Sequence, residues 1–214
     1  ESAVITWEAV SDRIGVFVSE AGTGSALNDN AYYDAYTSTA SSRFFPLKDA
    51  DKLKWEDGKK YDVALYYPFT TKMKDAASIP VSVSENQVVS IPLTTTQLKR
   101  SQIFVSSVKS VERPDNGILE MSLAPVLAFV KINVSSNLPV ACNSVKLSGE
   151  DGTALAFKHA KYDLFTSSLS EIDSVSSVIN VKPASPVYLR RKATEFIVNV
   201  NPQYAGKTLT IDCD

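Results

Sequence analysis

Short runs in which apolar and polar residues alternate recur along this chain, and the clearest run covers residues 61–69. In that run, apolar side chains occupy every second position: Tyr61, Val63, Leu65, Tyr67 and Phe69. Alternation with a period of two residues is the pattern of a half-buried β-strand. Pro68 has no backbone N–H, so this strand is predicted to end there or to lie at a sheet edge. The turn residues Glu-Asp-Gly at 56–58 favour a hairpin before it.

The same pattern recurs between clusters of Gly, Pro, Asn, Asp and Ser, which are typical of turns. The predicted strands are 3–7, 13–19, 61–67, 81–84, 88–93, 103–108, 120–123, 126–134, 144–147, 154–157, 177–181, 187–190, 194–200 and 208–213. We expect a long connection at 21–43, a loop with a strand edge at 167–177 and one short helical turn at 94–100. No stretch sustains apolar spacing of three and four residues. The sequence therefore predicts an all-β protein built from antiparallel β-sandwiches.

The strand pattern restarts after a strong turn signal at Asn116-Gly117. A length of 214 residues suits one large or two small domains. We therefore predict an N-terminal β-sandwich at 1–120 and a C-terminal β-sandwich at 121–214, the latter lacking its last strand.

Charge and targeting signals narrow the class of partner. The formal net charge is −2 and the sequence pI is about 5.5. With no long block of Lys and Arg, this argues against a nucleic-acid partner. The sequence contains no apolar stretch of membrane-spanning length. It begins at Glu1 within a strand pattern, which is consistent with an export segment that has been cut off.

Catalytic and metal chemistry have little support in the composition. His159 is the one histidine and lies between Lys158 and Lys161, so we expect a solvated surface residue. One His and two Cys cannot build a common zinc site, and no Gly-x-Ser-x-Gly motif is present. Carboxylate pairs such as Asp49/Asp51 and Asp212/Asp214 could offer oxygens to Ca²⁺, but no twelve-residue calcium loop surrounds them. We predict no catalytic residue, no metal and no cofactor, and hence no enzyme.

The cysteines, Cys142 and Cys213, permit one disulfide at most. Exported proteins can keep such a bridge. A buried cysteine also serves as a small apolar residue. Free thiols are the favoured interpretation, with a Cys142–Cys213 disulfide as the alternative.

Aromatic residues offer a second open question. Six of them could form a sugar-binding platform: Tyr32, Tyr33, Tyr36, Trp55, Tyr66 and Tyr67. The strand pattern uses several of the same rings, with Trp7, as core. We favour the core, with a glycan-binding surface protein as the alternative function.

Two segments carry a family resemblance. The first, at 7–18, reads Trp-Glu-Ala-Val-Ser-Asp-Arg-Ile-Gly-Val-Phe-Val, and the second is Tyr66-Tyr-Pro-Phe69. Between these two segments lie Asn-Ala-Tyr at 30–32 and Phe-x-Pro at 44–46. After the second segment come the predicted strand at 89–93, Gln97 and the strand start at 103–105. In the order of these motifs the sequence resembles the fimbrillins, the subunits of the outer-membrane-anchored type V pili of Bacteroidales. One departure is Phe129-Val-Lys131, which replaces a Phe-x-His motif.

The resemblance implies two tandem transthyretin-like (Greek-key) antiparallel β-sandwich domains. It implies a structural subunit, stalk or tip, of a cell-surface pilus that contributes to adhesion. Such subunits are exported as lipoproteins to the outer-membrane surface, cleaved near the N-terminus and polymerised by β-strand exchange. The implied partners are other pilus subunits and a host protein or glycan receptor. Contact with the membrane would come only through an N-terminal lipid anchor that this sequence lacks.

The two ends of the sequence are the predicted strand-exchange elements. At the N-terminal end the candidates are Ala3, Val4, Ile5 and Trp7, in a short terminal strand that costs little to detach. At the C-terminal end they are Leu209 and Ile211, in a strand with no following turn. We expect the second sandwich to expose a strand edge over an apolar groove.

Overall fold

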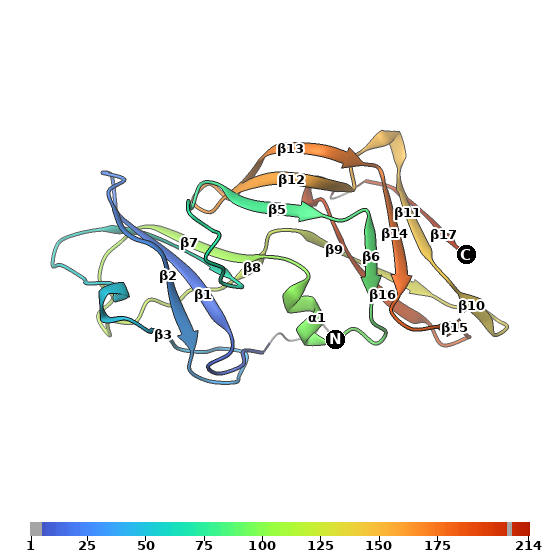
Figure 1. Cartoon of the computed structure of the whole chain (residues 1–214), viewed down its shortest axis with the longest axis horizontal. Coiled ribbons are helices and arrows are strands. Elements are labelled where there is room, and N and C mark those ends of the chain that lie inside the picture. The colour runs from blue at the N-terminus through green and yellow to red at the C-terminus, as the bar shows by residue number, and fades with distance from the viewer. Residues whose placement is uncertain (1–5, 205–206) are drawn as a thin grey trace. The chain divides into compact units, whose positions relative to one another are not determined.

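The computed structural model describes residues 6–204 and 207–214, and its regular secondary structure consists mostly of β-strands (Figure 1). The first strands are β1 (Arg13–Glu20), β2 (Ala26–Ala35), β3 (Phe44–Pro46), β4 (Tyr61–Tyr67), β5 (Ile79–Val83), β6 (Asn86–Val89), β7 (Phe104–Val111) and β8 (Ala124–Pro125). The later strands are β9 (Ala128–Val134), β10 (Val140–Cys142), β11 (Val145–Gly149), β12 (Ala156–Asp163), β13 (Ser168–Ser176), β14 (Val178–Pro183), β15 (Val187–Leu189), β16 (Thr194–Val200) and β17 (Leu209–Cys213). The α-helix α1 spans Thr95–Arg100. The predicted all-β class is confirmed.

The chain forms two compact units, each assembled from several segments. The first comprises the described residues up to Pro80, with Ile103–Val126 and Lys161–Ser170. The second comprises Val81–Gln102, Leu127–Ala160 and the described residues from Glu171 onward. These units interleave along the sequence, so they do not follow one cut at residue 120. The domains 1–120 and 121–214 stay a prediction, as does their transthyretin-like topology.

The first unit contains a six-stranded sheet in the order β3-β2-β1-β4-β7-β8. Its strands are antiparallel and the two resemblance segments are neighbours within it, with Gly15 opposite Tyr66. The Tyr66 ring lies across Gly15, where a methyl group added to the glycine would meet the ring at 2.1 Å. The Tyr66 hydroxyl donates to Asn30 Oδ1 at 2.7 Å and accepts from the Thr70 N–H at 3.2 Å. The glycine therefore provides the space that this buried ring fills.

Strand β4 is buried on both faces, whereas its sequence predicts a half-buried strand. One face joins a core cluster formed by Ile14, Val16, Val18, Tyr61, Val63, Tyr67 and Phe104. On the other face, Ala64 and Tyr66 are fully buried. The physical reason is position: β4 lies in the middle of the sheet, between β1 and β7. The strand ends at Tyr67, directly before Pro68, as predicted.

The second unit contains the sheet β17-β11-β14-β6 and two-stranded sheets β16-β9 and β10-β15. The pairs are antiparallel except β14 with β6, which is parallel. Every second residue of β11, β14 and β16 points into the core, where these side chains are fully buried: Val145, Leu147, Ile179, Val181, Phe196 and Val198. A further sheet has the order β13-β12-β5.

Several local predictions are corrected by pairing. The connection predicted at 21–43 contains the strand β2, because that segment pairs with β1. The loop predicted at 167–177 contains β13, and β12 runs to Asp163 instead of stopping at 157. The predicted strands at 3–7 and 120–123 also fail where they can be checked: Thr6, Trp7 and 120–123 are not in strands, and residues 3–5 lie outside the described part. The helical turn at 94–100 is confirmed as α1, capped by Thr94 Oγ1, which accepts from the Gln97 N–H.

Candidate assembly surfaces

The N-terminal segment is held to the first unit by an aromatic anchor. Trp7 is half-buried, with its ring edge-on to Phe44 at 4.8 Å and to Tyr67 at 5.2 Å between centroids. The Trp7 N–H donates to the Thr39 carbonyl at 2.9 Å. Trp7 thus attaches this segment through ring packing and not through a strand ladder. Its sequence neighbours Ala3, Val4 and Ile5 lie outside the described residues, and the exchange role of all four stays a prediction.

A tight turn at residues 8–12 fixes where this segment leaves the core. Asp12 is buried, and its carboxylate accepts from the Tyr67 hydroxyl and from the Glu8 N–H, both at 2.7 Å. The Asp12 N–H in turn donates to the Glu8 carbonyl at 2.9 Å. Val10, at the top of the turn, has φ of +67° and a side chain 70% exposed. A β-branched residue rarely adopts this conformation, so the surrounding bonds impose it.

The C-terminal strand β17 forms one edge of its sheet. It pairs with β11, with Ile211 opposite Leu147. Its side chains are mostly exposed, Ile211 at 44% and Leu209 less so. The predicted strand at 208–213 is therefore confirmed, while the part of Leu209 and Ile211 in strand exchange stays a prediction.

A second edge, which the sequence did not indicate, runs along β16. Among the described residues β16 pairs with β9 and with no other strand. At Asn199 the other edge is occupied by the side chain of Gln87. The Gln87 amide donates to the Asn199 carbonyl at 2.8 Å and accepts from the Asn199 N–H at 3.1 Å. One side-chain amide thus supplies the two hydrogen bonds that a neighbouring strand would supply.

Beside this edge lies a small, mostly apolar cavity of about 60 Å³. Its apolar lining includes Val89, Leu93, Leu98, Phe129 and Ile197. Gln97 also lines it, and its Oε1 is buried without a hydrogen-bond partner among the described residues. Backbone groups of residues two apart on a strand point the same way, so Ile197 and Glu195 present theirs to this edge, as Asn199 does. We call this feature the β16 edge.

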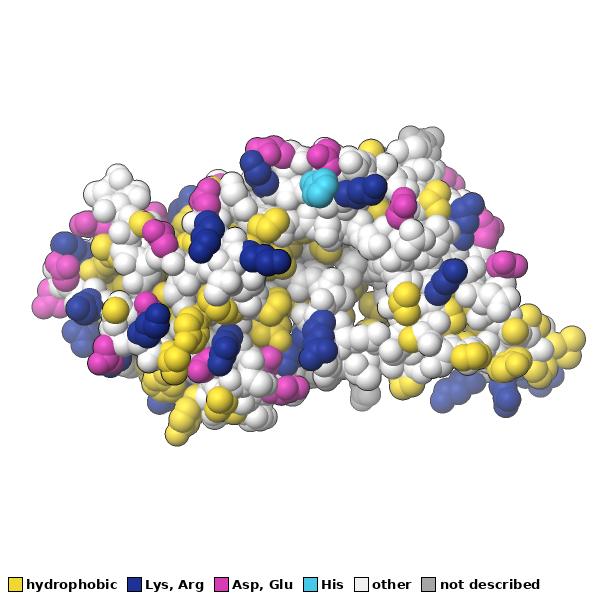
Figure 2. Space-filling model, in the orientation of Figure 1, with side chains coloured by type: hydrophobic (Ala, Val, Ile, Leu, Met, Phe, Trp, Pro, Cys, Tyr) yellow, Lys and Arg dark blue, Asp and Glu magenta, His cyan; other side chains and the backbone are white. Residues whose placement is uncertain are grey.

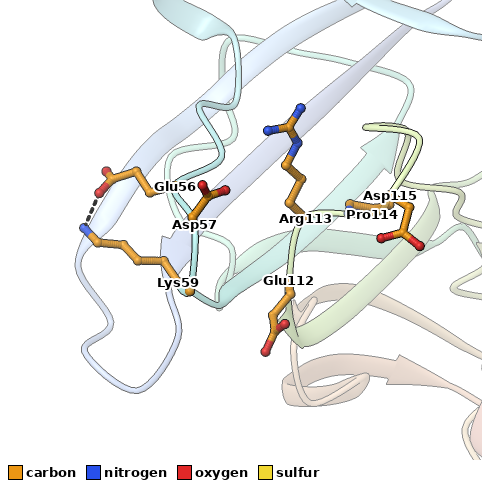
Figure 3. Close-up of a pocket in the computed structure, with 8 residues that line it drawn as sticks. Glu56, Asp57, Lys59, Glu112, Arg113, Pro114 and Asp115 are labelled. Carbon is orange, nitrogen blue, oxygen red and sulfur yellow. Dashed lines mark ion pairs between the residues drawn. The ribbon is translucent and has the colours of Figure 1, made fainter.

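The first unit carries a larger but polar hollow of about 330 Å³ (Figure 3). Its charged side chains come from the turn at 56–59 and the segment at 112–115. Lys59 Nζ lies 2.9 Å from Glu56 Oε2, and this hydrogen bond raises the pKa of the exposed lysine. The chemistry available there is that of solvated ion pairs, which contribute little binding energy. In the part of the chain that the structure describes, no group of three His, Cys, Asp or Glu side chains could hold a metal ion.

The aromatic candidates are mostly packed inside. Tyr66 and Tyr67 are buried, Trp55 packs edge-on against Tyr61 at 5.2 Å, and Tyr32 contacts Phe69 at the same distance. Tyr33 donates to the Asp51 carbonyl, and burial raises its pKa. Tyr36 differs, being 69% exposed. The core interpretation therefore holds for Tyr66 and Tyr67, while Trp55 and Tyr33 are half-buried and pack against the core cluster. Tyr32 is half-buried outside that cluster.

The polar candidates have simpler outcomes. His159 is exposed, as expected. Cys142 and Cys213 are both free thiols in the structure, the first buried and the second exposed. No helix within 6–204 or 207–214 has both the length and the apolar character that a membrane crossing requires.

These features define a class: an all-β protein in which the distinctive surfaces of the described residues are the strand edges at β16 and β17. The comparison with protein families gives the particular family, since residues 3–214 match the fimbrillin-like family Mfa_like_1. The chain belongs to that family.

Two solved structures share the fold. One is a proposed cell adhesion protein from Bacteroides uniformis ATCC 8492, with a TM-score of 0.60, 18% identity, and coverage of 99% of this chain and 77% of the other. The second is a proposed cell adhesion protein from Bacteroides ovatus ATCC 8483, with a TM-score of 0.56, 15% identity, and coverage of 99% and 78%. No curated protein matches the chain.

Proposed function

We propose that this protein is a structural subunit, stalk or tip, of a cell-surface pilus, polymerised by β-strand exchange and contributing to adhesion. The observation that carries the proposal is the fimbrillin-like match over residues 3–214. The description of both structural relatives as cell adhesion proteins supports it. The proposal includes two transthyretin-like sandwiches, export to the outer-membrane surface by way of a lipid anchor, and assembly with other pilus subunits.

The β16 edge supports strand exchange physically. A strand edge without a strand partner, beside an apolar hollow, recruits a further strand because its backbone N–H and C=O groups gain partners. An incoming strand would replace the Gln87 side chain, which makes two hydrogen bonds, with a full ladder. The donor we propose is a terminal segment of another subunit, either 3–7 or 208–213.

Trimming the N-terminal segment tests this assembly. Removing residues 1–9 deletes the Trp7 anchor and the donor candidate 3–7 while keeping Asp12 and 208–213. We therefore expect oligomers in size-exclusion chromatography with light scattering if the C-terminal strand is the donor, and loss of assembly if 3–7 is. A matched control is Val175→Ala, which changes an exposed apolar residue on β13 and should leave the chain monomeric. Trimmed and full chains that remain equally stable monomers would rule out the N-terminal segment as the displaceable element.

The donor strand is tested separately. Ile211→Ser alters an exposed side chain of β17 and should reduce assembly of the trimmed chain if 208–213 is inserted. If assembly is unchanged, the C-terminal strand is not the donor, and since the trimmed chain also lacks 3–7, neither terminal segment would then be the donor.

The alternative function, a glycan-binding surface lipoprotein, retains one observation. Tyr36 and Phe45 are 69% and 51% exposed, and their rings pack edge to face at 5.5 Å. Glycan titration followed by Trp fluorescence, repeated with Tyr36→Ala, tests it. Saturable binding by the monomer that Tyr36→Ala abolishes would favour this alternative.

A further inference from the structure

One end of the second unit combines exposed apolar side chains with consecutive cations. We call it the β10–β15 tip, and it consists of Leu138, Val140, Tyr188, Arg190, Arg191 and Lys192. β10 and β15 pair antiparallel, with Ala141 opposite Tyr188. The Ser136 N–H donates to the Arg190 carbonyl at 2.9 Å, which joins the loops that follow β9 and β15. Figure 2 shows hydrophobic side chains gathered at the right-hand end, with Lys and Arg side chains just below them.

The apolar side chains of the tip are displayed on its outer surface. Leu138 is 72% exposed and Tyr188 61%, whereas Leu189 and Cys142 are buried beneath them. Ala141 is the cross-strand neighbour of Tyr188, and its methyl group is too small to cover the ring. The short sheet therefore presents one face of an aromatic ring to solvent on a strand, not on a mobile loop.

The charge of the tip is uncompensated. Arg190, Arg191 and Lys192 are all exposed, and none forms an ion pair with another described residue. Arg190 directly follows β15 and is exposed like Tyr188, whereas Leu189 between them is buried. This local positive potential stands on a chain whose net charge is −2, so it selects an anionic partner.

We propose that the β10–β15 tip binds a sulfated polysaccharide. The planar guanidinium fork matches a sulfate group in bidentate geometry, as it matches phosphate and carboxylate. The exposed Tyr188 ring offers an apolar face to a sugar ring, and Leu138 adds exposed apolar surface to the tip. An anionic membrane is less suited, because stable insertion needs a larger apolar surface than one loop leucine and a strand tyrosine. This ligand goes beyond the assembly role and does not depend on strand exchange.

The test uses the monomeric full chain and immobilised heparin as the sulfated probe. The variant Arg190→Gln/Arg191→Gln/Lys192→Gln should weaken binding about tenfold or more, since each lost cation removes a charge-assisted hydrogen bond. The matched control is Lys146→Gln/Lys158→Gln/Lys182→Gln, which removes the same charge from exposed positions of the same unit. That control should stay within about twofold of the parent.

A second variant separates the ring from the charges. Tyr188→Ala should weaken heparin binding several-fold while its salt dependence stays unchanged, because no cation is lost. Desulfated heparin should not bind, and the thermal unfolding of every variant should match the parent. Absence of heparin binding, or equal losses in the two triple variants, overturns the proposal. Tighter binding to phosphatidylserine vesicles than to heparin, abolished by Leu138→Ser, would instead assign the tip to a membrane.

Discussion

At the scale of single residues, the pairing of Gly15 with Tyr66 explains why the two resemblance segments need these residue types. The ring occupies the volume of the missing side chain, and its hydroxyl is bound to Asn30 and Thr70. The ring therefore cannot move aside without losing hydrogen bonds in a buried setting. Cross-strand covering of a glycine by an aromatic ring is a known means of stabilising a sheet.

Gly15→Ala should consequently destabilise the protein by about 3 kcal/mol, the upper range for an overpacked core. Urea unfolding measures the change. In a Tyr66→Ala background the same Gly15→Ala change should cost little, because the clashing ring is gone, giving a large coupling in the double-mutant cycle. Additive effects in that cycle would contradict the packing explanation.

The two thiols should differ in reactivity. Cys213 is exposed and Cys142 is 3% exposed. Burial raises the pKa of the Cys142 thiol, and partial desolvation together with the neighbouring Asp212 carboxylate raises the pKa of the Cys213 thiol. The thiolate is the reactive form. Iodoacetamide should therefore label Cys213 slowly near neutral pH, faster as the pH rises, and Cys142 only after unfolding. Intact-mass spectrometry reads the result, and a native protein that takes no label before reduction would reveal a disulfide instead.

At the scale of elements, β6 and β16 show how a side chain can stand in for a strand. Gln87 and Asn199 are 112 positions apart in the chain, yet they exchange two hydrogen bonds. Asn199 also receives a bond from Gln102, whose own Oε1 accepts from the Leu127 N–H at 2.9 Å. These amides connect the α1-containing segment to β16 and β9 within the second unit.

We call the two hydrogen bonds between the Gln87 amide and the Asn199 backbone the Gln87 clip. Gln87→Ala should remove it and lower the free energy of unfolding by about 1–2 kcal/mol, since the Asn199 backbone groups lose their partners. Hydrogen exchange at the Asn199 amide should accelerate, because that N–H loses its acceptor. Asn86→Ala is the matched control, one position earlier in β6, with an exposed side chain. Unchanged protection of Asn199 in Gln87→Ala would show that the clip does not close this edge in solution.

At the scale of the whole molecule, stability should fall at alkaline pH. Burial raises the pKa of Tyr66 and of Tyr33, so the folded state favours their neutral hydroxyls. An unfolded tyrosine ionises near pH 10, about its ordinary value. The stabilisation is complete below that pH and is lost as the pH rises through the raised folded pKa values. Tyr66→Phe should flatten this decline in the unfolding free energy, whereas Tyr188→Phe, at an exposed position, should not.

Much of the local structure was predictable because it depends on neighbours in sequence. The alternation at 61–67, the end at Pro68 and the turn at Asn116-Gly117 all follow from backbone geometry within a few residues. Thr94 marks the start of α1 for the same reason, through its bond to the Gln97 N–H. The family resemblance also lies in short motifs, so it too could be recognised in the linear chain.

Long-range pairing decided the rest. β2 and β13 are strands because β1 and β12 pair with them, although their own sequences are polar and turn-like. Burial of both faces of β4 depends on its central place in the sheet. The alternation of apolar and polar residues within one strand does not predict that place. The interleaved units, the Gln87 clip and the β10–β15 tip each join residues far apart in sequence. The sequence by itself determined strand propensity, turn positions and the family, whereas the pairing partners and the free edges were decided only by tertiary structure, because each depends on contacts that local periodicity does not encode.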